Sequence, residues 1–141
     1  MIEKQLSLFL VNKPGVLAEV CKTLGANGIN IRGMSISDTV DHAVVRMIVD
    51  DPRKAVHVLG DHGVLVVETD VLAVKIGDHP GELAKIARKL ARAKINIEYA
   101  YGTSNGEAAT LFIRVSDARK AKMVLTARPK KKTKKTGIEK A

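Results

Sequence analysis

The stretch Asn12-Lys13-Pro14-Gly15-Val16-Leu17-Ala18 occurs twice, because it returns as Asp78-His79-Pro80-Gly81-Glu82-Leu83-Ala84. Each copy follows an apolar, strand-like run and opens a helix-like run. Proline is favoured at the first position of a helix, and glycine permits a tight turn. We expect Asn12 and Asp78 to cap these helices, whose free N–H groups and positive dipole ends would suit a carboxylate.

The two copies belong to a longer internal repeat. A shift of 66 positions aligns residues 12–55 with residues 78–121 without a gap, and 14 of the 44 aligned pairs are identical. Chance would give roughly three identical pairs, so the sequence indicates a duplication. Units of roughly 65 residues bury a limited core, and we therefore expect the two to pack on each other and on another chain.

The hydrophobic pattern predicts the same elements in both copies. In the first copy these are a strand at 5–11, a helix after Gly15, strands at 29–36 and 43–49, a helix capped by Asp51, and a strand at 64–67. Gly33 interrupts the alternation of the second strand, which favours a bulge or a close backbone approach. The corresponding strand at 95–101 alternates cleanly, and Asp117 is the expected cap of the last helix. The strands at 43–49 and 109–115 should point one set of apolar residues inward: Val45, Met47 and Val49, matched by Leu111, Ile113 and Val115.

This βαββαβ order is the ferredoxin-like arrangement, so the predicted fold class is α+β with two such units side by side. Only residues 68–70 separate the fourth strand of the first unit from the first strand of the second. Where the second unit should have its fourth strand, residues 128–135 form a lysine-rich run that cannot bury a strand face. We therefore predict a first domain at 1–69, a second at 70–127 that lacks its last strand, and a basic tail at 128–141.

Composition narrows the classes of function. The net charge is +9, but seven basic residues and one acidic residue lie from Arg128 onward, and the remainder carries only +3. One cysteine excludes an internal disulfide and a Cys-x-x-Cys site. The four histidines have no metal-ligand spacing, and no catalytic constellation or cofactor motif can be assembled. We expect neither an enzyme nor a metal or cofactor site, and a cytoplasmic location without a membrane span.

A βαββαβ unit with Asn-x-Pro-Gly-x-Leu-Ala after its first strand and Ile-Asn-Ile at the start of its second resembles the ACT domain, a small regulatory module that binds amino acids. The resemblance covers residues 4–67 and 71–126, and the duplication is similar to that of stand-alone tandem ACT proteins. It implies a ligand held at an interface where two modules meet edge to edge, with backbone groups from the first loop and helix start on one side and the second strand on the other. The ligand-binding residues that it implies are Asn12, Pro14, Gly15, Val16, Leu17, Asn30 and Ile31 in the first unit, and Asp78, Pro80, Gly81, Glu82, Leu83, Asn96 and Ile97 in the second.

The two implied sites differ chemically. Asn12 offers both a donor and an acceptor, whereas Asp78 only accepts and adds a negative charge. Glu82, where the first unit has Val16, adds a second negative group beside the same turn. We therefore expect the first-unit loop to be the better site for a carboxylate. Alternatively, Gly15 and Gly81 are only tight-turn glycines, and Asn30 and Asn96 are solvated polar residues on a strand.

The leading hypothesis is a non-catalytic regulatory protein that binds a free amino acid, forms a homo-oligomer such as a dimer, and signals to an enzyme of amino-acid metabolism. The alternative is an interaction subunit with degenerate ligand sites, whose basic tail binds an acidic partner or nucleic acid. RNA recognition by base stacking is not expected, because the four central strands hold only Phe9 and Phe112 as aromatic residues. The tail has no apolar stripe that would bind it to a membrane surface. Alternatively, the tail binds nothing and only keeps the protein soluble.

Overall fold

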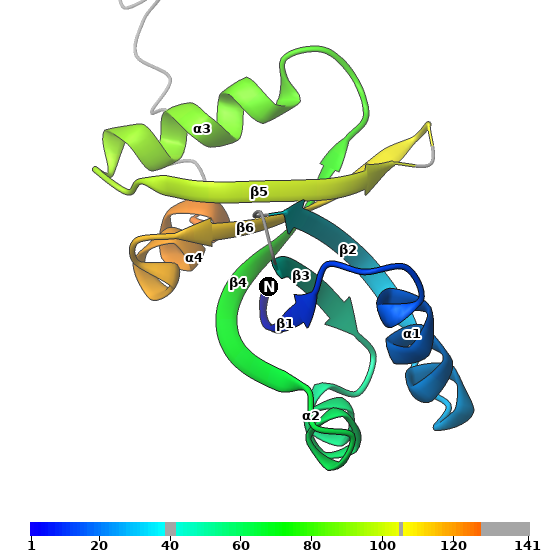
Figure 1. The fold of residues 1–141 in the computed structure, drawn as a ribbon. Coiled ribbons are helices and arrows are strands. Elements are labelled where there is room, and N and C mark those ends of the chain that lie inside the picture. Colours follow the sequence, from blue (N-terminus) through cyan, green and yellow to red (C-terminus); the bar gives the residue numbers. More distant parts are fainter. Residues whose placement is uncertain (39–41, 105, 128–141) are drawn as a thin grey trace, which may run out of the picture.

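The structure is a computed structural model that describes residues 1–38, 42–104 and 106–127 (Figure 1). The predicted basic tail, 128–141, lies outside the described residues. The elements, in chain order, are β1 (Ile2–Val11), α1 (Val16–Ala26), β2 (Ile31–Asp38), β3 (His42–Val49), α2 (Pro52–Asp61), β4 (Leu65–Gly77), α3 (Glu82–Arg92), β5 (Ile97–Ser104), β6 (Ala108–Val115) and α4 (Ala118–Thr126). The predicted order of elements is confirmed.

The six described strands form one antiparallel sheet in the order β2-β3-β1-β4-β6-β5. The 13-residue strand β4 serves both units, because its first part pairs with β1 and its last part with β6. The expectation that residues 68–70 connect two strands is wrong. Glu68 and Thr69 pair with Leu6 and Gln5 inside the strand, so the predicted boundary between residues 69 and 70 falls within β4.

We call residues 1–69 unit one and residues 70–127 unit two. The core of unit one lies between α1, α2 and one sheet face, and that of unit two between α3, α4 and the corresponding face. The predicted inward residues of β3 and β6 lie in these cores, most of them fully buried: Val45, Met47 and Val49, and Leu111, Ile113 and Val115. The predicted caps are also confirmed, because Asp51 and Asp117 accept the N–H groups of Lys54 and Lys120 at 3.1 and 3.0 Å.

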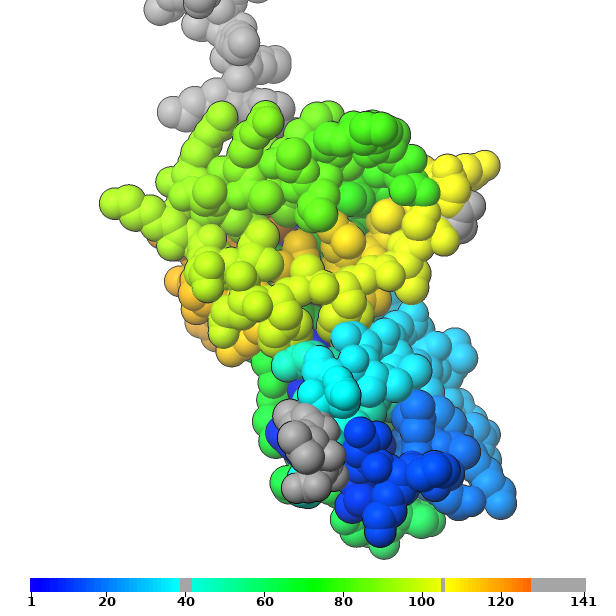
Figure 2. Space-filling view, turned by 45° about the horizontal axis from the view of Figure 1, so that its top comes forward, coloured from blue at the N-terminus to red at the C-terminus, as the bar shows by residue number. Residues whose placement is uncertain are grey.

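The sheet faces that carry no helix turn toward each other where the two units meet. Figure 2 shows the units as two lobes, and in Figure 1 β5 crosses over β2. A third buried cluster joins the faces, with Ile48 from β3, Val71 from β4 and Phe112 from β6. Buried Gln5 donates to the Tyr99 hydroxyl at 2.7 Å and accepts from the Tyr101 hydroxyl at 2.8 Å.

Gly33 shows why the two faces approach so closely. A Cβ at this position would lie 2.7 Å from the ring of buried Phe112. The register between β2 and β3 also shifts between Ile31 and Gly33, so both predictions for this glycine are confirmed. In unit two, β5 alternates half-buried and exposed residues as predicted, and it also shifts its register against β6 between Ile97 and Tyr99.

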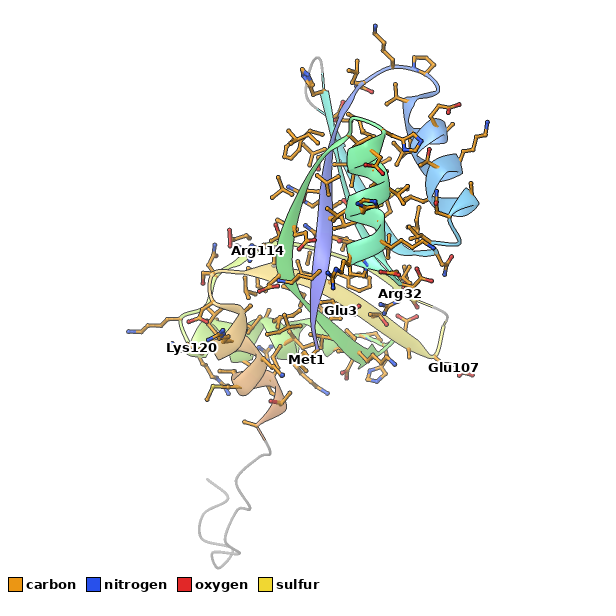
Figure 3. All side chains as sticks on the ribbon, turned by 90° about the horizontal axis from the view of Figure 1, so that it is seen from below. Met1, Glu3, Arg32, Glu107, Arg114 and Lys120 are labelled. Carbon is orange, nitrogen blue, oxygen red and sulfur yellow. The ribbon has the colours of Figure 1, made fainter. Side chains whose placement is uncertain are left out.

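The start of β1 occupies part of the place where unit two lacks a fourth strand. Ile2 pairs with Leu72, and the Ala73 N–H donates to the Met1 carbonyl at 2.6 Å. Figure 3 shows Met1 at the end of β1 that lies against unit two. The sheet edge that the missing fourth strand leaves in unit two is thus covered by β1 as far as Ala73, and among the described residues no strand pairs with Lys75 on that side.

Candidate functional site

The Pro-Gly corner of unit one joins β1 to α1 and lies at the surface. The Lys13 N–H donates back to the Val11 carbonyl at 3.0 Å, and Gly15 then adopts a left-handed conformation with φ of 87°. Gly15 is the N-cap, and no side chain caps the helix. The prediction that Asn12 caps α1 is therefore wrong, as is the placement of Pro14 in the first helical turn. The left-handed turn at glycine starts the helix in its place.

The corner leaves backbone donors exposed at the start of α1. The first regular helical bond is donated by Glu19 to Gly15 at 3.0 Å, and the Val16 N–H makes only a long contact of 3.4 Å with the Lys13 carbonyl. Across the described part of the chain, the N–H groups of Leu17 and Ala18 have no acceptor. Two free donors at the positive end of a helix dipole suit a carboxylate oxygen.

The corner of unit two repeats the backbone and changes the side chains. Gly81 is the N-cap with φ of 92°, so Asp78 does not cap α3 and Pro80 precedes the helix. The Asp78 carboxylate instead accepts a hydrogen bond from the Ser104 hydroxyl of β5. The N–H groups of Leu83 and Ala84 again lack an acceptor among the residues described, and the Leu83 side chain is exposed.

Glu82 places a negative charge in the first turn of α3. Its carboxylate lies 3.0 Å from the Lys85 ammonium and 3.3 Å from His79 Nδ1. The hydrogen bond from Lys85 lowers the pKa of Glu82, and the charges of Lys85 and His79 act in the same direction. A ligand carboxylate would therefore meet an ionised group beside the free amides. Val16 holds the corresponding position in unit one.

The predicted asparagines lie at the other end of each unit's first helix. Their backbone N–H groups bond to equivalent side chains, since the Asn30 N–H donates to the Asp50 carboxylate at 3.0 Å and the Asn96 N–H to the Ser116 hydroxyl at 3.1 Å. Both asparagine side chains are exposed. An 11-residue helix is about 16 Å long, so neither loop meets the asparagine of its own unit. The half-buried Ile31 and Ile97 pack against the two cores. The loop and asparagine sets could meet only across an interface.

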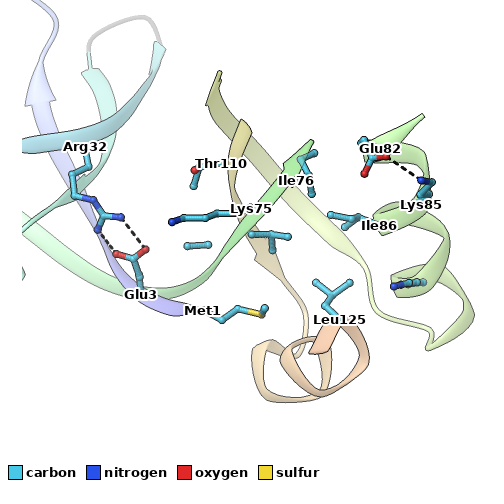
Figure 4. Close-up of a pocket in the computed structure, with 13 residues that line it drawn as sticks. Met1, Glu3, Arg32, Lys75, Ile76, Glu82, Lys85, Ile86, Thr110 and Leu125 are labelled. Carbon is cyan, nitrogen blue, oxygen red and sulfur yellow. Dashed lines mark hydrogen bonds and ion pairs between the residues drawn. The ribbon is translucent and has the colours of Figure 1, made fainter. Parts of the chain in front are cut away.

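The hollows of the surface lie elsewhere. A groove of about 560 Å³ follows β4 beyond the start of β1, and of the predicted residues it contains only Glu82. Figure 4 shows its floor at Lys75 and Ile76, with the Glu3–Arg32 ion pair on one side and Ile86 and Leu125 on the other. A second hollow of about 350 Å³ between α1 and α2 includes Val16 alone of the predicted set. The groove was not predicted from the sequence. The absence of a fourth strand in unit two was the signal that could have located it, because that absence leaves one side of β4 without a neighbouring strand beyond Ala73.

The described residues give no sign of a metal centre, because no three of their His, Cys, Asp or Glu side chains converge. Their helices are also all too short or too polar to cross a membrane. What remains is a pair of surface corners, each with free helix amides, on a duplicated βαββαβ sheet. This combination defines a small module built from two copies of one unit, each with its own Pro-Gly corner.

Comparison with known proteins identifies the family. The family model described as "ACT domain pair" matches residues 1–136, and the chain belongs to this family. The match confirms the predicted resemblance to ACT domains. A comparison with curated proteins found no match.

Solved structures share the fold. The crystal structure of protein BT0572 from Bacteroides thetaiotaomicron is 39% identical, covers 89% of this chain and 87% of its own, and has a TM-score of 0.86. The ligand-free regulatory subunit of aspartate kinase from Thermus thermophilus is 20% identical with a TM-score of 0.69, over 89% of this chain and 91% of that one. The equivalent subunit from Thermus flavus is 19% identical with a TM-score of 0.62, over 89% and 93%. At these lower identities the likeness concerns the fold alone.

Proposed function

We propose that the chain is a non-catalytic regulatory protein that binds a free amino acid at the Pro-Gly corner of unit one. The observation that carries the proposal is the pair of free amides of Leu17 and Ala18 at an exposed helix start. Membership of the ACT domain pair family supports it. In this proposal, the backbone amides and the side-chain NH2 of Asn12 donate to the ligand carboxylate, a role that an aspartate cannot fill.

The ligand-binding site is completed across an interface between two units or two chains. The corner itself is open, and Asn30 and Ile31 lie at the far end of α1, so a second unit or chain must supply the other wall. Asn12, Pro14, Gly15, Val16 and Leu17 form the first wall, and the start of a second strand, Asn30–Ile31 or Asn96–Ile97, forms the other. Asp78, Pro80, Gly81, Glu82 and Leu83 form a weaker counterpart, because the charges of Asp78 and Glu82 oppose a carboxylate.

Regulation then follows from linkage. A ligand that binds one arrangement of the chains better than another shifts the population toward it. The recipient of this shift would be an enzyme of amino-acid metabolism. The T. thermophilus relative is described as a regulatory subunit of aspartate kinase, which supports an enzyme as the class of partner.

A thermal-shift screen of the twenty amino acids tests the proposal. Ligand at 100 times its Kd stabilises the folded state by about 2.7 kcal/mol. We expect one amino acid or a few chemically related ones to raise the melting temperature clearly. If none of the twenty raises it at millimolar concentration, amino-acid binding by this chain is wrong.

Two matched variants test which of the two Pro-Gly corners binds the ligand. Asn12→Asp adds one charge to an exposed side chain of unit one, and Asp78→Asn removes one at the equivalent position of unit two. We expect Asn12→Asp to raise the Kd about tenfold, through repulsion of about 1.4 kcal/mol between two partly screened carboxylates. Asp78→Asn should leave the Kd of the unit-one site unchanged. Equal effects of the two variants, or an effect of Asp78→Asn alone, would contradict the assignment.

A further inference from the structure

The groove along β4 lies where unit two lacks a fourth strand. Strand β1 pairs with β4 only as far as Ala73, whose N–H donates to the Met1 carbonyl at 2.6 Å. Because antiparallel pairing uses every second residue, the N–H and C=O groups of Lys75 point to the same side as those of Ala73. Among the described residues no backbone group bonds to Lys75 on that side. The groove of about 560 Å³ therefore exposes a short free edge of the sheet.

In unit one, the equivalent position is filled by the unit's own fourth strand. Leu65 of that strand pairs with Phe9, the residue that the repeat places at the position of Lys75. Val64 and Val66, on either side of Leu65, point inward and pack against the core of unit one. A segment that fills the groove of unit two in the same way is extended, with apolar residues on both sides of the one that faces Lys75.

The hollow of about 350 Å³ between α1 and α2 is the unit-one counterpart of the groove. Val64 lines this hollow and partly fills it. The two linings correspond through the 66-residue shift of the repeat: Leu10, Val20 and Leu59 in unit one, and Ile76, Ile86 and Leu125 in unit two. The groove thus keeps the apolar lining that receives a strand in unit one, and no strand of the described chain enters it.

The charge of the groove is where the two units differ. Three lysines line it at positions where unit one has no basic residue: Lys75 replaces Phe9, Lys85 replaces Glu19, and Lys89 replaces Thr23. Lys85 is paired with Glu82 at 3.0 Å. Lys75 on the sheet and Lys89 on α3 are exposed, and neither makes an ion pair with a described residue. A segment in the groove therefore meets two unpaired positive charges.

We propose that the free edge of β4 binds an extended acidic segment of a partner protein, which joins the sheet as the missing fourth strand of unit two. The residue opposite Lys75 is an aspartate or a glutamate, because opposite charges that face each other across antiparallel strands attract. The residues on either side of it are apolar and enter the groove, as Val64 and Val66 do in unit one. Backbone bonds at Lys75 contribute affinity, and the alternating side chains contribute specificity.

Charge argues against the two occupants that this chain could itself supply. The basic tail follows α4 in the sequence, but its lysines would meet Lys75 and Lys89 with like charge. Two copies paired edge to edge at this place would bring the same lysines together. The proposal is derived from the groove alone and does not rest on amino-acid binding at the Pro-Gly corners.

Fluorescence anisotropy with a labelled peptide tests the proposal on the full chain. The probe is the blocked peptide Val-Asp-Val-Glu-Val-Asp-Val, and the control is Val-Val-Asp-Glu-Asp-Val-Val, which has the same composition and charge without the alternation. We expect a Kd of about 10–100 µM for the alternating peptide and binding about tenfold weaker for the control. Binding through the basic tail depends on charge and would not distinguish the two peptides.

Charge-reversal variants test whether the peptide lies in the groove. We expect Lys75→Glu to raise the Kd of the alternating peptide about tenfold, and Lys89→Glu about threefold. The matched control is Lys54→Glu, which makes the same change of charge at an exposed lysine of α2 in unit one and should leave the Kd unchanged. Because all three side chains are exposed, circular dichroism should show each variant folded.

Hydrogen exchange reports the strand pairing itself. The Lys75 amide should exchange rapidly in the free chain and slowly with the peptide bound, whereas the Ala73 amide, already bonded to Met1, should be slow in both. Protection of Lys75 in the free chain would mean that the tail or a second copy covers the edge, and this would overturn the proposal. Equal binding of the two peptides, equal weakening by Lys54→Glu, or no binding at about 1 mM peptide would overturn it as well.

Discussion

The two Pro-Gly corners have nearly the same backbone and different chemistry. Gly15 and Gly81 are both left-handed N-caps, with φ of 87° and 92°, and each is followed by free helix amides. Unit one has the neutral Asn12 and Val16 at the positions where unit two has Asp78 and Glu82, which interact with Ser104, His79 and Lys85. The duplication thus preserved the element that makes a helix start. It changed the charge of the side chains beside that start, because Asp78 and Glu82 replace Asn12 and Val16.

The same contrast holds where the units touch. Unit two contributes large aromatic side chains to the interface, and unit one contributes the smaller or polar surface that they cover. Phe112 faces Gly33 of β2, and its equivalent in unit one is Arg46. The guanidinium of Arg46 lies 4.0 Å from the centre of the Tyr99 ring. The two halves of the repeat are therefore complementary at this contact and not interchangeable.

The largest expected effect comes from removing the aromatic ring at that contact. Phe112→Ala should lower the free energy of unfolding by about 3–5 kcal/mol, because the ring is 2% exposed and its loss leaves a cavity. Arg46→Ala, at the equivalent position of unit one, should cost about 1 kcal/mol through the lost cation–π contact. Urea unfolding of both variants measures the difference. Equal losses would mean that the two units contribute alike to their interface.

A smaller effect concerns pH. Burial raises the pKa of the Tyr101 phenol above its ordinary value, because the charged form loses water. The unfolded chain therefore releases this proton first, and stability that is complete below about pH 10 should fall as the pH rises above that value. Tyr101→Phe should abolish this part of the alkaline loss. Unit one has Ser35 at the position equivalent to Tyr101, so we expect no matching loss from unit one. Unfolding measured by urea at a series of pH values, with phenolate absorbance as a second signal, tests the prediction.

The smallest expected effect lies at the ends of α1 and α3. Gly28 and Lys94 occupy equivalent positions, and both are left-handed, with φ of 71° and 58°. A lysine is strained in this conformation, so Lys94→Gly should stabilise the protein by about 1 kcal/mol, and Gly28→Ala should destabilise it by a similar amount. Melting curves of the two variants give the comparison. A loss of stability in Lys94→Gly would show that the lysine side chain makes a compensating contact.

The order of elements, the inward faces of β3 and β6 and the Asp51 and Asp117 caps could be predicted because each depends on local pattern. The start of α1 was misplaced, because the pair Pro14-Gly15 is compatible both with a proline in the first turn and with a glycine cap. The run Glu68-Thr69-Asp70 looked like a connection because it is polar. It is polar because β4 passes there from one unit to the other and meets solvent.

The candidate site was only partly predictable for a similar reason. Local pattern locates the corners, but which amides remain free depends on the turn geometry. The groove along β4 depends on where β1 begins against its neighbours. That is a property of strand register across the whole sheet, and residue spacing within one segment does not encode it.

Strand β4 has a further consequence for how this chain can be divided. Its 13 residues span about 43 Å and belong to both halves without a hinge between them. A cut near Asp70 would separate Ile2 from Leu72 and divide the buried cluster of Ile48, Val71 and Phe112, so we expect neither half to be stable as a free-standing fragment. Because both units share this strand, neither unit can be exchanged or removed as a separate domain, and the two form a single folding unit.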